Sequence, residues 1–322
     1  MHKGARWFAC IMVPLLLGTA AQAVRAQAYP DKSVRFIVAT SAGSAADVLA
    51  RVLTEAMSRT LGQPIIVEAK PGADQIIGME YLAKAAPADG YTVGVIGIDG
   101  QTLLPTLKKG LRFDPLADLA SVAGLGELRY VLAGPASTSY RNFKDMVDAA
   151  KSQPGKFNYG ASGPQVRFPT LLLMQELGLD MVYVPYSGGS AYVAAVAAGT
   201  IDWGVMSESS GNPLKPRVRF YGITGRQRSP VNPDVPTFAE LGFPRIYGPA
   251  YALTVRTGTP QAVIEKLSTA AAAALASAEM KASAQKIQFE IHYENTAAAV
   301  RTLQERSRFY QEQARKLGLQ PE

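Results

Sequence analysis

The feature that most constrains the fold is a strand, a loop of small residues and a helix that follow one another between residues 34 and 60. Val34, Phe36 and Val38 occupy alternate positions, which is the pattern of a β-strand. Residues 39–44 are small, and apolar residues then recur at helical spacing from Val48 onward. The chain therefore begins its fold with a β–loop–α unit.

This loop has the chemistry of an anion site. A loop between a buried strand and a helix N-terminus leaves backbone N–H groups unpaired beside a partial positive charge, which suits a carboxylate. Gly43 allows close approach of a ligand to the backbone. A plain strand–helix connection remains the alternative. Asp47 is interpreted as a first-turn acid that fixes the loop, although it is kept among the candidate ligand contacts, which are Thr40, Ser41, Ala42, Gly43, Ser44 and Asp47.

Strands and helices then alternate, which predicts an α/β fold with a doubly wound, mostly parallel sheet. Strands are expected at 64–68 and 91–98, and a polar loop at 98–102 contributes Asp99, Gly100 and Gln101 as candidate ligand contacts. Ligands of such sheets bind at the carboxyl ends of the strands. We therefore expect the loops at 39–47 and 98–102 to face one crevice.

A second α/β unit begins near residue 157 and repeats the strand–loop–helix pattern of the first. Its loops are expected at 161–165 and 187–190, and an alanine-rich helix ends at Gly199 as its C-cap. The remaining expected helices run through 81–85 and at 143–151, 170–177, 260–284 and 296–317, the last two being long. The remaining expected strands are at 128–133, 157–160, 182–186, 201–206, 218–224 and 247–255. Two such units predict a ligand cleft between lobes.

The N-terminal residues predict a secretory signal peptide. Lys3 and Arg6 precede an apolar stretch, and cleavage is expected after Ala26, with Ala23 as the alternative. Cys10, the only cysteine, lies inside this segment rather than after it, so a lipoprotein is not expected. Removal of three basic residues lowers the net charge from +7 to +4 (30 basic against 26 acidic). Because no basic run with interleaved aromatic residues occurs, nucleic acid is not expected as a partner.

An enzyme, a metal site and a cofactor are not expected. His292 would be the one histidine of the processed chain, and its apolar neighbours favour a packed or surface strand position. The segment 160–164 differs from a nucleophile elbow at Pro164. Neither zinc-ligand spacing nor a phosphate-binding P-loop is found.

In order along the chain, a set of short motifs resembles the solute-binding receptors of tripartite tricarboxylate transporters, also called the Bug family. The motifs run from Tyr29-Pro30-Asp31-Lys32 through Lys70-Pro71-Gly72-Ala73, Asp89-Gly90-Tyr91-Thr92, Pro154-Gly155-Lys156-Phe157-Asn158-Tyr159, Val184-Pro185-Tyr186 and Pro233-Asp234-Val235-Pro236-Thr237 to Gly258-Thr259-Pro260. Each motif alone is weakly specific, but together they cover nearly the whole mature chain.

The resemblance implies a two-lobe periplasmic-binding-protein fold of type 2, with lobe one at 27–128 and 247–322 and lobe two at 129–246. It implies a periplasmic receptor, expected as a monomer, that captures a small carboxylated solute and delivers it to membrane transporter subunits. A ligand-sensing partner of a membrane sensor kinase is the alternative. The expected lobe-two contacts are Ser162, Gln165, Arg167, Ser187, Gly188, Gly189, Ser190 and Ser207.

Several positions depart from the family pattern, so a plain dicarboxylate or tricarboxylate is not a secure ligand assignment. Arg167 is either a bidentate carboxylate clamp or a solvated arginine at a helix start. Asp99 and Asp74 either pair with Arg167, read an N–H group of the ligand, or face solvent. The serines are hydrogen-bond donors or helix N-caps. Tyr186 and Trp203 either stack on an aromatic ligand or belong to the core.

Overall fold

The computed structural model describes residues 29–161 and 163–321. The predicted signal peptide, with Cys10 and both candidate cleavage sites, lies outside the described residues, as does Ser162. Within the described ranges, none of the helices combines the length and the apolar character needed to cross a bilayer.

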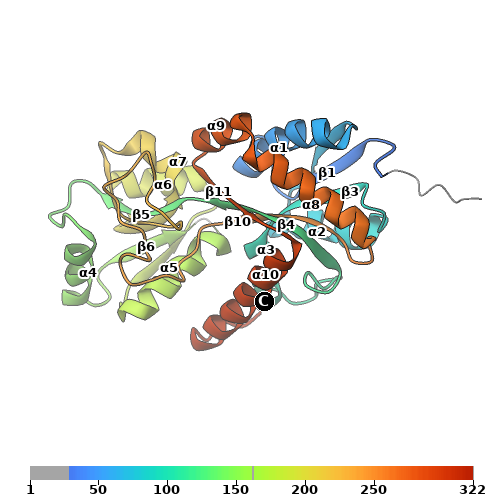
Figure 1. Ribbon diagram of the computed structural model, residues 1–322. Helices are drawn as coiled ribbons and strands as arrows, with labels where there is room; N and C mark the ends of the chain where they lie inside the picture. The colour runs from blue at the N-terminus through green and yellow to red at the C-terminus, as the bar shows by residue number, and fades with distance from the viewer. Residues whose placement is uncertain (1–28, 162, 322) are drawn as a thin grey trace, which may run out of the picture.

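Two β-sheets organise the described part of the chain (Figure 1). The first sheet has the strand order β11-β4-β10-β3-β1-β2, and the second has the order β7-β6-β8-β5-β9. The strands are β1 (Val34–Val38), β2 (Ile65–Ala69), β3 (Thr92–Gly97), β4 (Leu119–Leu128), β5 (Tyr130–Pro135), β6 (Asn158–Ala161), β7 (Val182–Pro185), β8 (Trp203–Ser207), β9 (Val218–Ile223), β10 (Ala250–Arg256) and β11 (Phe289–Glu294).

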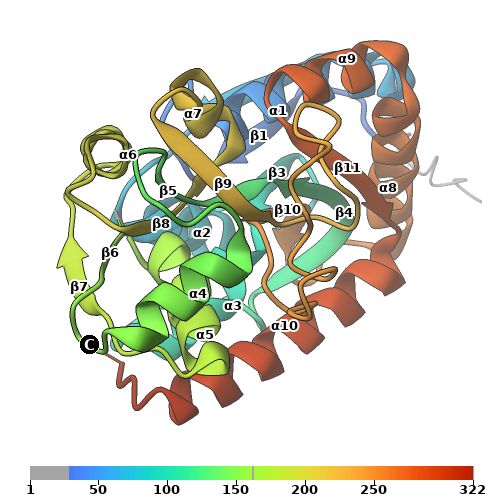
Figure 2. The same ribbon diagram turned by 90° about the vertical axis from the view of Figure 1, so that its left-hand side faces the viewer.

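Helices cover both sheets, as the alternating pattern predicts (Figure 2). The α-helices are α1 (Ala45–Leu61), α2 (Ile76–Glu80), α3 (Ile98–Leu107), α4 (Phe143–Ser152), α5 (Pro164–Leu177), α6 (Gly189–Ala198), α7 (Glu208–Gly211), α8 (Gln261–Ala276), α9 (Ala278–Lys286) and α10 (Thr296–Lys316). The short turns η1 (Ala73–Gln75), η2 (Tyr81–Ala85) and η3 (Asn212–Leu214) complete the elements.

The first sheet contains both parallel and antiparallel strand pairs, and β3 lies at its centre. Every residue of β3 is buried, which accounts for its continuous apolar run, because a strand covered on both faces needs no polar side. β3 pairs in parallel with β1 and antiparallel with β10. The first sheet is therefore parallel at its N-terminal strands and antiparallel at β10, β4 and β11, and the second sheet is mixed as well. The prediction of a mostly parallel sheet is wrong, because β4, β5, β9, β10 and β11 add antiparallel neighbours.

The chain crosses between the two sheets at Arg129, which separates β4 from β5, and again between β9 and β10. The two crossings lie side by side, because the amide of Leu128 donates to the carbonyl of Pro249 at 2.9 Å. A Cβ on Gly248 would lie 2.2 Å from the carbonyl oxygen of Leu128, so only glycine allows this close approach.

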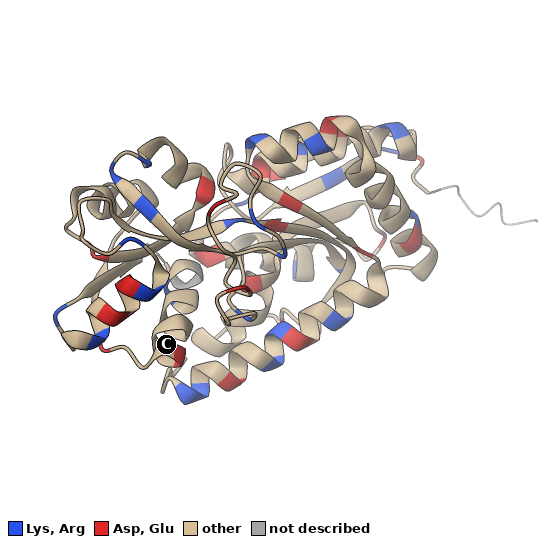
Figure 3. Cartoon of the chain, turned by 60° about the vertical axis from the view of Figure 1, so that its left-hand side comes forward, with Lys and Arg blue, Asp and Glu red and all other residues tan. Residues whose placement is uncertain are grey.

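The C-terminal helix α10 runs beneath both halves (Figures 1 and 2). Its Leu303 packs with Ile98 and β10, whereas Phe309, Tyr310 and Ala314 pack in the cluster that contains Trp203 and the residues around it in the second sheet. Figure 3 shows basic and acidic positions following one another along this helix. α10 thus has one charged side and one side that is shared between the two halves.

Several predicted boundaries are wrong. The expected loop at 98–102 forms the first turns of α3, and α5 begins at Pro164 rather than at Thr170. The single helix expected at 260–284 is two helices, because Ser277 ends α8 and its hydroxyl accepts from the amide of Met280 at the start of α9. No strand was predicted at β4, and at β11 the sequence favoured a strand position only for His292.

Candidate functional site

The carboxyl ends of β1, β2 and β3 meet at one edge of the first sheet. The three strands are parallel neighbours, so the segments that follow them, at 39–44, 70–75 and 97–100, share that edge. The side chain of Gln75 accepts from the amide of Gly97 at 3.2 Å. A Cβ on Gly100 would lie 3.0 Å from Gln75 Nε2, so the second and third segments are in contact.

The loop at 40–47 is held by its own side chains. Ser44 is the N-cap of α1 and accepts from the amide of Asp47, and its hydroxyl lies 2.8 Å from that of Thr40. Asp47 is 3% exposed and accepts from the Gly43 amide and from Arg51 Nε, both at 2.9 Å. The hydrogen bond from Arg51 lowers the pKa of Asp47, and the Gly43 amide adds to this effect against the opposing effect of burial. These contacts support the interpretation that Asp47 fixes the loop; a ligand contact by Asp47 stays a prediction.

This arrangement leaves backbone donors unused. Within the described residues, the amides of Ser41, Ala42, Ala45 and Ala46 donate no hydrogen bond. Ser41, Ala42 and Gly43 are exposed. Four unpaired N–H groups beside the start of a 17-residue helix make an electropositive backbone surface.

The segment after β2 holds three consecutive non-glycine residues in the left-handed region. The φ angles of Ala73, Asp74 and Gln75 are 47°, 53° and 78°. Each such residue costs on the order of 1 kcal/mol, and backbone strain of this kind is concentrated at functional sites. Gln75 was not among the candidate ligand contacts predicted from the sequence, although it directly follows Asp74, which was considered.

Asp99 is neither paired with Arg167 nor facing solvent. It is 8% exposed, accepts from the hydroxyl of Tyr310 at 2.6 Å and forms an ion pair with Arg306 at 3.2 Å. Its second oxygen accepts from the amide of Ala250 at 3.3 Å. Asp99 is thus committed to groups of the protein in this structure, and a role toward the N–H group of a ligand stays a prediction.

Gln101 and Gly100 are also buried. Gln101 has no exposed surface, and its Nε2 donates to the carbonyl of Pro115 at 2.7 Å. The prediction of a polar loop failed here because polar residues that find partners inside the protein have the same sequence pattern as polar residues in solvent.

The carboxyl ends of β6, β7 and β8 form the matching edge of the second sheet. β6 pairs in parallel with both β7 and β8, so the segments that follow the three strands share one edge. In the segment after β7, Ser187, Gly189 and Ser190 are exposed. Gly188 is the N-cap of α6 and provides no side-chain cap, so neither Ser187 nor Ser190 is its N-cap. Ser207 caps α7 through the amide of Ser210.

Arg167 is half-buried in the first turns of α5, whereas the side chain of Gln165 lies outside the described part of the structure. The Arg167 guanidinium lies over the ring of Tyr183, 4.3 Å from its centroid. Burial raises the pKa of the Tyr159 hydroxyl, and a hydrogen bond with Arg167 partly offsets this rise. Arg167 Nε is buried and has no hydrogen-bond partner among the described residues. The arginine is therefore stacked rather than fully solvated, and the carboxylate clamp stays a prediction.

The two expected aromatic contacts differ in burial. Trp203 has no exposed surface and belongs to the core of the second sheet. Tyr186 is half-buried and packs against Tyr192, with ring centroids 5.9 Å apart. These positions support the core interpretation for Trp203.

One residue, Tyr310, contacts both sheet edges. Its hydroxyl donates to Asp99, which lies two residues beyond β3, and its ring packs edge-on against Phe168 in α5, with centroids 5.3 Å apart. Phe168 lies in the first turns of the helix that follows β6. Tyr310 therefore connects α3, which follows a strand of the first sheet, with α5, which follows a strand of the second.

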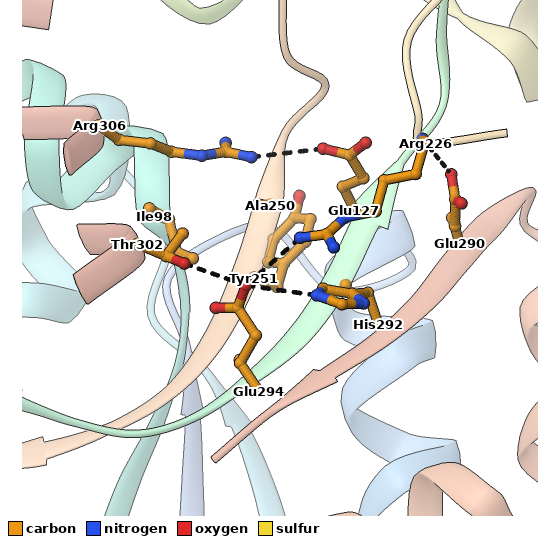
Figure 4. Close-up of a pocket in the computed structure, with 12 residues that line it drawn as sticks. Ile98, Glu127, Arg226, Ala250, Tyr251, Glu290, His292, Glu294, Thr302 and Arg306 are labelled. Carbon is orange, nitrogen blue, oxygen red and sulfur yellow. Dashed lines mark hydrogen bonds and ion pairs between the residues drawn. The ribbon is translucent and has the colours of Figure 1, made fainter. Parts of the chain in front are cut away.

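A buried network of charges lies beside the crossing strands, and Figure 4 shows its Arg306–Glu127 pair. Arg306 pairs with Asp99 and, at 3.4 Å, with Glu127, and Arg129 pairs with Glu290 at 3.1 Å. Burial raises the pKa of Glu127 to about 6, although Arg306 acts in the opposite direction. This network was not predicted, because its partners lie up to 207 residues apart and no local pattern in the sequence indicates them.

The cavity drawn in Figure 4 has a volume of about 50 Å³. His292 lines it from β11, with Nε2 3.4 Å from Glu294, as expected for a strand histidine at the surface. A space of this size holds one or two water molecules rather than an organic solute.

Comparison with known proteins gives a consistent result. Residues 49–319 match the model of the family described as "Tripartite tricarboxylate transporter family receptor". The chain is 31% identical over 291 residues to the UPF0065 protein in the gbd 5′ region of Cupriavidus necator, covering 87% of this chain and 86% of that protein.

Solved structures agree with this match. A structure described as a periplasmic transporter is 30% identical, with a TM-score of 0.77 and coverage of 91% of this chain and 99% of that one. Malate-bound MatC from Rhodopseudomonas palustris is 25% identical, with a TM-score of 0.71 and coverage of 88% and 99%. The fold is the two-lobe α/β fold of periplasmic binding proteins, as predicted. The chain belongs to the tripartite tricarboxylate transporter receptor family.

Proposed function

We propose that this receptor binds a small carboxylate-containing solute between the carboxyl edges of its two sheets and delivers it to a membrane transporter of the tripartite tricarboxylate type. The observation that carries the proposal is the double contact of Tyr310, with Asp99 on one side and Phe168 on the other. Because ligands of α/β sheets bind at carboxyl edges, two such edges that approach each other form a natural binding cleft.

The unpaired backbone amides supply the affinity for an anion. Ser41, Ala42, Ala45 and Ala46 offer donors on the first sheet. The segment 187–190 offers donors at the start of α6 on the second. Malate, the ligand bound to MatC, is a small carboxylate, and MatC has a similar fold. The solute would thus be held by N–H groups and helix dipoles, which bind a carboxylate without reacting with it.

Binding would act on the relative position of two lobes, which we assign to residues 27–128 with 247–322 and to residues 129–246. A ligand that contacts both lobes binds the closed state more tightly than the open state, and it therefore shifts the population toward closure. We further propose that the chain is exported to the periplasm, acts as a monomer and uses neither catalysis nor a cofactor.

The test is a thermal-shift screen of the purified protein against dicarboxylates, tricarboxylates, amino acids and aromatic acids, with calorimetry on each hit. A solute present at 100 times its dissociation constant adds about 2.7 kcal/mol to the free energy of unfolding. Protein that is folded and free of co-purified ligand, yet shifts with none of these acids, would contradict the proposal.

Gly43, in the loop at 40–47, and Gly62, at the end of α1, provide a matched pair of variants that tests this loop. Gly43 and Gly62 have φ angles of 79° and 72°, and a Cβ would meet nothing within 4 Å at either position. Both Gly43→Ala and Gly62→Ala should lower stability by about 1 kcal/mol, since alanine is strained at positive φ. Only Gly43→Ala should weaken the binding of the acid. Equal affinities of the two variants for the acid would show that the loop at 40–47 is not part of the binding site.

A further inference from the structure

A second cavity, of about 160 Å³, lies between α3, α5, β7 and the C-terminal tail. Its lining residues are Leu107, Lys108, Gly163, Arg167, Phe168, Leu171, Tyr183, Leu319 and Gln320. For comparison, an engineered apolar cavity of 150 Å³ in another protein binds benzene. The space therefore accommodates a compact body of about one ring.

The chemistry of the lining is specific in two respects. Most of the wall is apolar, from three leucines, Phe168 and the ring of Tyr183, whereas the charged side chains are those of Lys108 and Arg167. Among the lining residues that the structure describes, there is no aspartate or glutamate. Within the described residues, neither cation forms an ion pair with a carboxylate of the protein, in contrast to Arg51, Arg129 and Arg306.

Arg167 also has a hydrogen-bond donor that no described residue accepts. Its guanidinium is stacked on Tyr183, and its buried Nε has no partner. A planar carboxylate can accept two hydrogen bonds from such a fork, and a lysine ammonium nearby adds a second positive charge. An apolar ring would then lie against Phe168 and Tyr183, where aromatic contacts are favourable.

From these observations we propose that this cavity binds a monocarboxylate with a compact apolar body of about one ring, such as benzoate. A short dicarboxylate fits poorly, because its second charge would be buried among leucines without a partner. The inference goes beyond the proposed function, since the wall contains none of the loop amides at 40–46 and 187–190.

The position of the cavity gives the bound acid a structural consequence. Lys108 follows α3, which is continuous with the first sheet, whereas Arg167 lies in α5, which follows a strand of the second. An acid held by both cations bridges elements of the two sheets. Its binding energy therefore favours the arrangement in which Lys108 and Arg167 approach each other.

Calorimetric titration of the purified protein with benzoate tests the proposal, with succinate titrated in parallel. Lys108→Gln should weaken benzoate binding about tenfold, whereas Lys109→Gln, at the exposed neighbouring lysine, should change it less than twofold. Leu319→Trp should abolish benzoate binding by filling the cavity from the tail. All three variants should keep their succinate affinity and their melting temperature within about 3 °C.

The proposal is overturned if folded protein shows no saturable benzoate binding, or if Lys108→Gln and Leu319→Trp bind benzoate as tightly as the parent. Succinate or malate binding without benzoate binding would overturn the cavity assignment and leave the proposed function intact. Benzoate binding that depends on Lys108 and Leu319, without binding of any dicarboxylate or tricarboxylate, would support the cavity and count against the proposed solute site.

Discussion

The two sheet edges differ in how their loops are held. On the first sheet, the loop 40–47 is fixed by Ser44, Asp47 and Arg51 in a connected set of hydrogen bonds. On the second, the segment 187–190 has a glycine N-cap and exposed serines. Within the described residues, one edge is therefore fixed by side-chain hydrogen bonds and the other has no side-chain cap. In a receptor, we expect such asymmetry to make the first edge the preorganised part of the site.

The largest expected effect comes from removing Arg306, the cation that pairs with both Asp99 and Glu127. Arg306→Ala leaves Asp99 and Glu127 buried without their cation, which should lower the free energy of unfolding by about 3–5 kcal/mol. Urea unfolding measures this loss. Arg301→Ala, at an exposed position of the same helix, is the control and should change stability by less than about 0.5 kcal/mol. Similar losses of unfolding free energy in both variants would argue against a stabilising role of the buried ion pairs of Arg306.

Substitutions in the two loops test the asymmetry directly. Asp47→Ala removes the acceptor of the Gly43 amide and the partner of Arg51, so stability should fall by about 1–3 kcal/mol. Ser190→Ala removes an exposed hydroxyl and should cost less than about 0.5 kcal/mol. Chemical denaturation of both variants provides the comparison. If Ser190→Ala were as destabilising as Asp47→Ala, the loops would be equally fixed.

The pH dependence of stability reports on the charge network behind both edges. The pKa of Glu127 is raised from 4.5 to about 6, so the folded protein binds more protons than the unfolded chain between these values. The contribution of Glu127 to stability is therefore fully present below pH 4.5 and is lost as the pH rises through 6. The loss amounts to at most about 2 kcal/mol.

Glu127→Gln isolates this contribution, because glutamine does not titrate. The difference in unfolding free energy between parent and variant should change by up to about 2 kcal/mol from pH 4.5 to pH 6.5. Denaturant titrations at several pH values measure it. A constant difference across this range would mean that Glu127 titrates alike in both states.

The smallest expected effect concerns the strained segment after β2. Asp74 is exposed at φ 53°, so Asp74→Gly should relieve strain and raise stability by about 0.5 kcal/mol. Gln75→Gly relieves similar strain but loses the hydrogen bond to the Gly97 amide, and it should not be stabilising. Thermal unfolding of the two variants distinguishes strain from contact; a loss of stability in Asp74→Gly would contradict this account.

The sequence was informative where structure is local. The alternation from Val34 to Val38 gave the bounds of β1, and Gly199 ends α6 in the left-handed conformation, as its position predicted. The order of short motifs identified the family. These signals lie within a few residues of one another, so they can be interpreted without knowledge of distant contacts.

The sequence was uninformative where partners are distant. Asp99 looked like a loop aspartate, but its partners, Arg306 and Tyr310, are 207 and 211 residues away. Arg167 was selected as a carboxylate ligand, yet its stacking on Tyr183 and the cavity beside it follow from the packing of α5 on β7. Gln75 was missed because its importance depends on the contact between two neighbouring loops.

Closure of the two lobes on solute binding is tested most directly by measuring a distance between the outer strands of the two sheets. Ile66 on β2 and Val182 on β7 are exposed at the outer strands of the two sheets, at 54% and 52% exposure. Spin labels at Ile66→Cys and Val182→Cys, in protein without residues 1–26 and hence without Cys10, report their separation by pulsed electron resonance. Saturation with an acid that binds by calorimetry should narrow the distance distribution and shift its mean. A distribution unchanged by a bound acid would contradict closure.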